Sequence, residues 1–227
     1  RYSSSAASDV YKRQGIGCHY LVQGMERETF TFTQMGGEGV SWIGQSAFTD
    51  TPHVFVNLGD GTYFHSGILA IRASVAAKVN ITYKILYNQA VAMTGGQPHD
   101  GELKAESIIQ QVLAEGVKRV VWVSDELEGK RVADFSGDVQ LRHRDDFDAV
   151  QRELREAKGV TCILYDQACA TELRRNRKRG LIPAAQQKVF INHQVCEGCG
   201  DCSVQSNCLA VEPLETALGT KRKIYQT

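Results

Sequence analysis

The sequence predicts an α/β fold with a mostly parallel, doubly wound sheet, followed by a smaller segment. Short apolar runs alternate with helical stretches along most of the chain, which is the pattern of strands joined by crossover helices. The runs are continuous rather than alternating, as in strands that are covered on both faces. The length of 227 residues suits one domain of this kind with a small appendage.

A strand, a glycine-rich turn, a helix and a second strand are predicted in succession. Val54–Leu58 is an apolar run that follows Pro52 and reads as the first strand. The turn Gly59-Asp60-Gly61 comes next, and a helix is predicted over Tyr63–Val79. The β-rich run Ile81–Leu86 is the second strand.

The same patterns predict the rest of the sheet. Each of two apolar runs follows a predicted helix. Both helices are expected to end at a glycine, because glycine is the usual residue just past a helix end. The segment between the first run and the second helix is polar and predicts a loop. In order, the elements are a helix over Lys104–Glu115, a strand over Val120–Val123, a loop over Ser124–Asp138, a helix over Phe147–Lys158, a strand over Val160–Tyr165, a further helix, and a short strand over Lys188–Ile191.

Three segments are expected. Residues 1–14 hold a Ser/Ala cluster and resemble a translated adapter joined to a gene; a genuine flexible N-terminus is the alternative, and both predict disorder. Residues 15–183 form the α/β domain, which ends where Gly180–Pro183 breaks the pattern. Residues 184–227 carry a cysteine group and form the small second segment.

Oxygen ligands follow both strands of the central unit. Asp60 offers a carboxylate, Asn88 a side-chain carbonyl and Ala90 a backbone carbonyl. Magnesium prefers such ligands in near-octahedral geometry and shares its shell with phosphate oxygens. Gly59 and Gly61 let the backbone approach a diphosphate closely. The alternative is an ordinary turn, since Gly-Asp-Gly is a common tripeptide.

Three neighbouring motifs favour the functional interpretation. Phe64-His65-Ser66-Gly67 follows the turn, Ala92–Gln97 lies beyond Asn88, and Met35–Val40 lies upstream. Together they resemble the thiamine-diphosphate-binding domain of 2-oxoacid:ferredoxin oxidoreductases, and within them the large fused bacterial indolepyruvate ferredoxin oxidoreductases. The resemblance runs from Gly15 to the end of the chain.

The cysteine group resembles one half of a ferredoxin module that holds a 4Fe–4S cluster. Its members are spaced by two, two and five residues: Cys196, Cys199, Cys202 and Cys208. Closely spaced thiolates suit such a cluster, whereas zinc prefers separated pairs; a zinc site and a disulfide pair are the alternatives. Cys208 either completes this cluster or ligates a second one, and Leu209 stands where a proline is usual.

The resemblance implies an enzyme that uses thiamine diphosphate, Mg²⁺ and iron–sulfur clusters. It would oxidatively decarboxylate an aryl 2-oxoacid such as indolepyruvate to an acyl-CoA and CO₂, with coenzyme A as acceptor and electrons passed to ferredoxin. His65 is the candidate catalytic residue, for a contact with the substrate carboxylate or a proton transfer. A non-redox thiamine-diphosphate decarboxylase and a non-catalytic electron-transfer module are the alternatives.

The resemblance also implies that the enzyme needs a pyrimidine-binding domain in addition to this sequence. The glutamate that activates the cofactor normally comes from a pyrimidine-binding domain, and nothing in this sequence resembles that domain. Glu38 is instead expected to order its glycine-rich loop. This chain alone is therefore expected to be inactive, and an oligomer is expected because thiamine sites commonly lie between domains or subunits.

Composition excludes several classes of protein. The 26 basic and 26 acidic residues balance, which argues against a nucleic-acid-coating protein. Arg174–Arg179 is a local basic run, read as a solvated helix end, with docking of acidic ferredoxin or a coenzyme A phosphate as its functional alternative. No apolar stretch approaches the roughly 20 residues of a membrane span. Reduced cysteines without a signal peptide favour the cytoplasm.

The remaining cysteines and histidines have simpler expectations. Cys162 and Cys169 are expected in the core, while Cys18 borders the cofactor in the resembling family. His19 has either a role in the site or a structural role. The other histidines are expected in loops or on the surface: His53, His99, His143 and His193.

Overall fold

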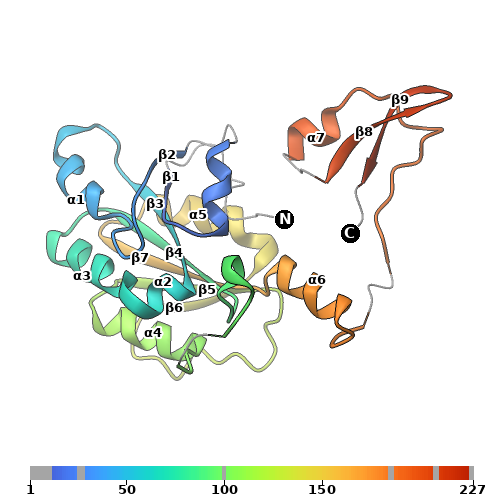
Figure 1. Cartoon of the computed structure of the whole chain (residues 1–227). Helices are drawn as coiled ribbons and strands as arrows, with labels where there is room; N and C mark the ends of the chain where they lie inside the picture. Colours follow the sequence, from blue (N-terminus) through green and yellow to red (C-terminus); the bar gives the residue numbers. More distant parts are fainter. Residues whose placement is uncertain (1–11, 25–28, 99–100, 184–186, 207–209, 225–227) are drawn as a thin grey trace. The chain divides into compact units, whose positions relative to one another are not determined.

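The computed structural model describes residues 12–24, 29–98, 101–183, 187–206 and 210–224 (Figure 1). The chain divides into two compact units, one ending at Glu172 and the other beginning at Leu173. The domain boundary expected after Pro183 stays a prediction.

The first unit is built on a seven-stranded sheet in the order β2-β1-β3-β4-β7-β5-β6. Every neighbouring pair in it is parallel. Parallel order follows from the crossover connections between the strands, and it confirms the predicted doubly wound α/β fold. The strands are β1 (Lys12–Gln14), β2 (Thr29–Phe32), β3 (Val54–Gly59), β4 (Ile81–Tyr87), β5 (Arg119–Ser124), β6 (Val139–His143) and β7 (Val160–Asp166).

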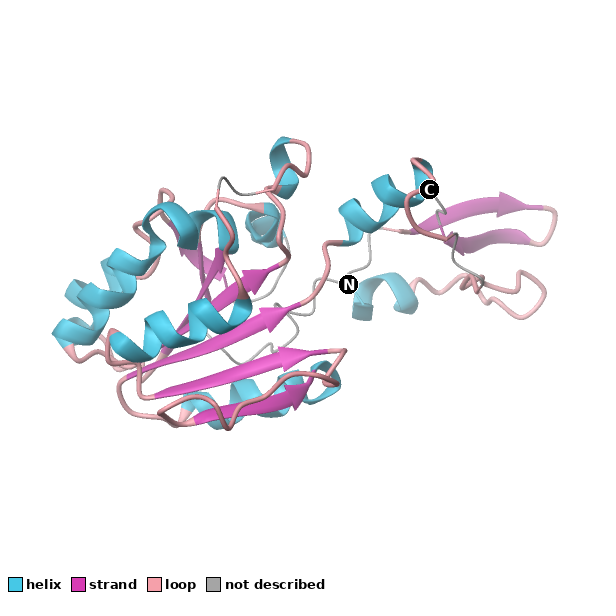
Figure 2. Cartoon of the chain, turned by 90° about the horizontal axis from the view of Figure 1, so that it is seen from below, coloured by secondary structure: helices cyan, strands magenta, loops and turns pink. Residues whose placement is uncertain are grey.

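Helices lie on both sides of the sheet (Figure 2). One core cluster joins the sheet to α1, α3 and α4, and a smaller cluster joins the opposite face to α5. Along β3, Val54, Val56 and Leu58 belong to the first cluster and Phe55 to the second, as the two-residue period of a strand requires. The helices of this unit are α1 (Val40–Gln45), α2 (Asp60–Thr62), the π-helical turn η4 (Tyr63–Gly67), α3 (Ile68–Ala77), α4 (Ala105–Ala114) and α5 (Phe147–Arg155), while α6 (Ala170–Lys178) includes the boundary between the two units.

Lys84 and His53 are among the polar side chains that are buried in this unit. Lys84 is fully buried, donates a hydrogen bond to Gln151 Oε1 over 2.9 Å, and lies near the face of the Phe147 ring. His53, expected in a loop or on the surface, lies in the loop before β3 but is buried: it is only 3% exposed, and its Nε2 lies 2.8 Å from Thr82 Oγ1. Both groups keep hydrogen bonds inside the protein, which limits the cost of burial.

Three local expectations are corrected. β6 follows the predicted loop and was missed, because its polar sequence lacks an apolar run. Lys12–Gln14, expected to be disordered, form β1 between β2 and β3; residues 1–11 lie outside the described residues. Lys188–Ile191 form no strand, since these residues find no partner strand in the described part of the chain.

The second unit contains α7 (Asp201–Ser206) and an antiparallel hairpin of β8 (Val211–Thr216) and β9 (Gly219–Ile224). The ferredoxin-like character of residues 184–227 stays a prediction. Over the described ranges, no helix combines the length and the apolar character that a membrane crossing requires.

Candidate cofactor site

The candidate site lies at the carboxyl ends of β1, β3 and β4. From β1 the chain continues to β2 on one side, and from β3 it continues to β4 on the other side. Such a reversal of strand order opens a crevice at the carboxyl edge, where ligands of open α/β sheets bind. The Gly15 N–H donates to the Asn57 carbonyl over 3.1 Å, so the turn after β1 runs beside the end of β3.

The Asp60 carboxylate joins the ends of two neighbouring strands. Its Oδ1 accepts the Gly61 N–H over 2.9 Å. Its Oδ2 accepts the N–H groups of Asn88 and Gln89, each over 2.8 Å, and Asp60 is only 2% exposed. The strand ends are therefore held together by backbone hydrogen bonds to one buried carboxylate at the crevice.

Asn88 begins a tight turn beside this carboxylate. Its Oδ1 accepts the Ala90 N–H over 3.0 Å, and Gln89 adopts a left-handed conformation with φ of 58°. This side-chain hydrogen bond to the backbone two residues on is an Asx turn. The Asx turn places Ala90 beside Asn88, and the hydrogen bond to Asp60 places Asn88 beside the carboxylate. The three expected magnesium ligands are therefore neighbours in the crevice.

These residues fit a magnesium–diphosphate group. Carboxylate and amide oxygens can accept more than one hydrogen bond or metal contact, and Asp60 and Asn88 place one of each at the crevice. A Cβ added at Gly59 would meet no atom within 4 Å, so the backbone there borders open space. The chemistry of the donor set is that of a hard cation site.

The helix after the turn is pressed onto β3. Asp60–Ala77 is one helical run whose middle is the π-helical turn η4. A Cβ at Gly67 would lie 2.6 Å from Leu58 Cδ1, so only glycine permits this approach. π-Helical turns inside α-helices are rare and recur at functional sites.

His65 lies on this π-helical turn. Its Nδ1 is 2.6 Å from Ser66 Oγ, and both side chains are at least partly exposed. One ring nitrogen is therefore engaged by a neighbour, which leaves Nε2 for another contact. Gly36 packs on Ser66 so closely that a Cβ there would collide with the Ser66 hydroxyl. The glycine-rich loop thus borders the candidate catalytic residue.

Glu38 orders that loop from inside. It is 1% exposed, and its Oε2 accepts the Gly36 N–H over 2.7 Å. The Tyr83 hydroxyl donates to the Glu38 carbonyl over 3.1 Å. Burial raises the pKa of Glu38. These contacts agree with the loop-ordering role expected for this glutamate.

The turn after β1 contributes a half-buried thiol and a buried imidazole. Cys18 is half-buried, whereas His19 is 5% exposed and its Nε2 has no hydrogen-bond partner among the described residues. Burial lowers the pKa of His19 to about 4, so the ring is neutral near pH 7. Their position beside the end of β3 places both near the crevice.

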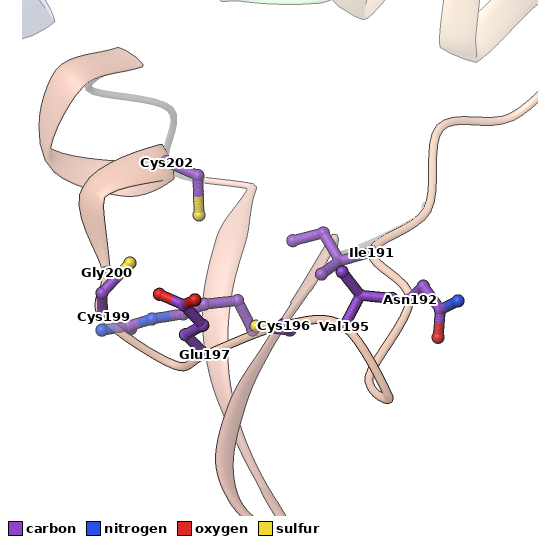
Figure 3. A pocket seen from close by; sticks show the side chains of 9 residues that line it. Ile191, Asn192, Val195, Cys196, Glu197, Cys199, Gly200 and Cys202 are labelled. Atoms are coloured by element: carbon purple, nitrogen blue, oxygen red, sulfur yellow. The ribbon is translucent and has the colours of Figure 1, made fainter.

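The cysteine segment belongs to the second unit. Cys196, Cys199 and Cys202 line one open pocket of about 370 Å³ (Figure 3). Within the described ranges, no three His, Cys, Asp or Glu side chains are grouped closely enough to hold a metal ion. Cys208, like His99, lies outside the described residues. Cys162 is buried as expected, and burial raises the pKa of its thiol.

Sequence comparison supports the family assignment. The family profile described as "Thiamine pyrophosphate enzyme, C-terminal TPP binding domain" matches residues 15–164, about two thirds of the 227 residues. The chain belongs to this family. Thiamine pyrophosphate is another name for thiamine diphosphate, and the crevice with Asp60 and Asn88 lies wholly inside the matched domain.

Curated relatives of this thiamine pyrophosphate domain are named indolepyruvate oxidoreductase subunit IorA. The Pyrococcus horikoshii protein is 27% identical over 164 residues, which cover 70% of this chain and 23% of that protein. The Thermococcus kodakarensis protein is 26% identical over 215 residues, which cover 86% of this chain and 31% of that protein. The resemblance drawn from the motifs is confirmed. The chain spans less than a third of the length of these relatives.

Solved structures share the fold of the domain. A 2-oxoglutarate:ferredoxin oxidoreductase from Magnetococcus marinus, with 2-oxoglutarate, coenzyme A and succinyl-CoA bound, matches with a TM-score of 0.53 and 19% identity over 72% of this chain and 56% of that chain. Benzoylformate decarboxylase from Polynucleobacter necessarius matches with a TM-score of 0.50 and 14% identity over 73% of this chain and 31% of that chain. At these identities the likeness shows the fold alone.

Proposed function

We propose that this chain is the diphosphate-binding part of an oxidoreductase that converts a 2-oxoacid and coenzyme A to an acyl-CoA and CO₂. Electrons would pass through a 4Fe–4S cluster to ferredoxin, and an aryl 2-oxoacid such as indolepyruvate is the proposed substrate. The similarity to proteins named indolepyruvate oxidoreductase supports the substrate class. A cytoplasmic, oligomeric enzyme that includes a pyrimidine-binding domain belongs to the same proposal.

The Asp60–Asn88 pairing carries the proposal. Asp60, Asn88 and the Ala90 carbonyl would hold Mg²⁺, while Gly59 and Gly61 would admit the diphosphate. Thiamine diphosphate, when bound, supplies the nucleophilic carbon that decarboxylation of a 2-oxoacid requires. The chain's own part is to bind and orient that group in the crevice.

His65 is proposed to act on the substrate. With Nδ1 engaged by Ser66, Nε2 would donate to the substrate carboxylate or move a proton there. The residue stands on the helix that begins at the proposed metal ligand Asp60, one turn along it. Its exposure leaves the ring accessible to a small acid.

The cysteine segment is proposed to hold iron–sulfur. Three thiols line one pocket, and Cys208 is the proposed fourth ligand. Anaerobic reconstitution with iron and sulfide should give the broad visible band of a 4Fe–4S cluster. Cys199→Ser should lower the iron content, whereas Cys162→Ser should not, since that thiol is buried in the other unit. Equal iron content in both variants would refute the ligand assignment.

Turnover is best tested in the natural protein that contains this sequence, produced at its full length and purified without oxygen. Indolepyruvate, coenzyme A, Mg²⁺ and thiamine diphosphate are added, and reduction of a viologen dye is followed. Coenzyme A-dependent reduction that is lost in Asp60→Ala supports the proposal. Reduction only with another 2-oxoacid would change the substrate. CO₂ release without dye reduction would favour a non-redox decarboxylase, and no reaction despite bound cofactor and cluster would favour an electron-transfer module.

A further inference from the structure

The charge of the chain is divided unevenly along the sequence. Residues 173–227 contain nine Lys and Arg against four Asp and Glu, whereas residues 1–172 contain the remaining 17 against 22. The second unit is therefore basic, although the whole chain is neutral. An asymmetry of this kind indicates a region that meets an anionic partner.

Helix α6 and the residue after it hold five of these nine cations. They are Arg174, Arg175, Arg177, Lys178 and Arg179. Glu172 is the one acidic residue of the helix, and α6 has no buried residue. The last three cations are exposed, and within the described part of the chain they form no ion pair. Most of this charge therefore faces solvent.

The spacing of these cations is unfavourable for the helix itself. Arg174 and Lys178 lie four residues apart, as do Arg175 and Arg179, and like charges at that spacing repel each other on a helix surface. The helix dipole favours cations only in the last turn, so it does not account for Arg174. Packing does not stabilise the helix either, since none of its side chains is buried. An acidic surface laid against α6 would remove the repulsion.

The surroundings of these cations favour a protein as the partner. Small ligands bind in concave sites that bury most of their surface, whereas α6 has no buried residue. Surfaces that bind single-stranded nucleic acids add aromatic side chains on which bases stack, and the sequence of α6 contains none. Protein interfaces combine arginine with apolar side chains. Leu181 is 69% exposed at the end of the helix, where its N–H donates to the Asn176 carbonyl over 2.9 Å.

We propose that α6, together with Arg179 and Leu181, is the docking surface for an acidic protein, the electron acceptor of the proposed function. The inference rests on that function for the identity of the partner and on the charges of α6 for the surface. A basic surface attracts an acidic partner and orients it before contact, which raises the association rate. Salt screens exposed charges, so binding weakens as the salt concentration rises.

The test is a binding titration of the natural protein, at its full length, with an acidic ferredoxin at low and at physiological salt. The triple variant Arg177→Gln/Lys178→Gln/Arg179→Gln should raise Kd about tenfold at low salt, because each exposed ion pair contributes up to a few-fold. It should also reduce the salt dependence.

The control removes the same charge from three exposed lysines that precede β4, β5 and β7. It is Lys78→Gln/Lys118→Gln/Lys158→Gln, and it should keep the wild-type Kd. Equal Kd values in the wild type and the α6 variant would overturn the inference. The same holds for an equal loss in both variants and for a wild type that does not bind ferredoxin.

A second measurement does not depend on the folding of a variant. A carbodiimide joins lysine amines to carboxylates that touch them, so in the wild-type protein it should link Lys178 to ferredoxin. Links found by mass spectrometry only at Lys78, Lys118 or Lys158 would overturn the inference. Tighter binding of a DNA duplex or of coenzyme A than of ferredoxin, lost in the α6 variant, would overturn it as well and assign the surface to phosphates.

Turnover distinguishes this inference from the proposed function. A viologen dye is small and needs no protein docking surface, so its reduction should be equal in the wild type and the α6 variant, while reduction of ferredoxin slows in the variant alone. Slow viologen reduction in the variant would assign α6 to another step and overturn the inference. Absence of viologen reduction in the wild type would refute the proposed function, and the binding titration would still decide where the acidic protein docks.

Discussion

Asp60 Oδ2 accepts the Asn88 N–H over 2.8 Å across the ends of two neighbouring strands. The two residues are proposed to share one magnesium ion, and the hydrogen bond fixes their relative position before any ligand arrives. The carboxylate is thus both a structural tie and a candidate ligand. Substitution of Asp60 is therefore expected to weaken ligand binding and, separately, to lower the stability of the fold.

Asp60→Asn should weaken both ligand binding and the fold. An amide has one oxygen and less charge, so it cannot accept all three backbone N–H groups and attracts Mg²⁺ less. Calorimetric titration with Mg²⁺ and thiamine diphosphate should show at least a tenfold loss of affinity, about 1.4 kcal/mol. Urea unfolding without ligand should lose about 1–3 kcal/mol. The exposed Asp50→Asn is the control, and equal values in both variants would count against this role.

Alanine substitution at two helical glycines should change the free energy of unfolding in opposite directions. A Cβ at Gly67 would press on Leu58, so Gly67→Ala should destabilise the domain by about 1–3 kcal/mol. A Cβ at Gly44, in α1, would meet nothing within 4 Å, so Gly44→Ala should stabilise by about 0.5–1 kcal/mol. Urea unfolding of both variants decides the matter. Stabilisation by Gly67→Ala would show that the helix does not need this close approach to β3.

The glycine-rich loop can be tested with another matched pair. Gly36 and Gly129 both have left-handed φ, 91° and 78°, so alanine strains the backbone at either position. Only at Gly36 does the new Cβ also collide, with Ser66 beside His65. Gly36→Ala should therefore lower affinity for Mg²⁺–thiamine diphosphate several-fold in the longest natural protein, while Gly129→Ala keeps it. A similar loss in Gly129→Ala would assign the effect to general destabilisation.

Buried His53 should make stability depend on pH. Burial lowers the pKa of His53 to about 4, below the usual 6.5 of the unfolded chain. Between these values the unfolded chain binds a proton that the folded protein does not, so stability is lost as pH falls from about 6.5 to about 4. At about 1.36 kcal/mol per pKa unit, the loss for this group is roughly 3 kcal/mol.

The measurement is urea unfolding at pH 7 and at pH 4.5. His53→Gln should show a smaller difference between the two pH values than the wild type does. His65→Gln, at an exposed position, should keep the wild-type difference. Buried His19, whose pKa burial also lowers to about 4, supplies part of the dependence that remains. An unchanged difference in His53→Gln would show that this ring is protonated in the folded protein.

Much of the sheet was predictable because its strands are apolar on both faces. β3, β4, β5 and β7 stand out as continuous runs, and the turn after β3 shows its carboxylate and glycines in the sequence. β6 and β1 escaped prediction because a polar strand is defined by its neighbours, which the sequence does not reveal locally. Buried Lys84 and His53 escaped for a related reason: their partners, Gln151 and Thr82, are distant in the chain.

The candidate site was predictable in its residue types but not in its connections. The spacing of Asp60 and Asn88 indicated two ligands, whereas the bond between them depends on the parallel register of β3 and β4. The contact of Gly36 with Ser66 likewise depends on folding of a distant loop onto the π-helical turn. In the cysteine segment, the spacing indicated the thiols but not the pocket that three of them line.

The short strand β1 determines where the sheet of this domain is expected to unfold locally. Among the described residues β2 pairs with β1 at the edge of the sheet, and their register shifts between Lys12 and Arg13. On one side of the crevice β3 and β4 are paired along their whole length. On the other side β2 is held by β1, which has only three residues and therefore few backbone hydrogen bonds. Local unfolding starts where such attachments are fewest. Amide hydrogens should therefore exchange faster in β2 than in β4, and this faster exchange should lie on the β1–β2 side of the proposed cofactor crevice.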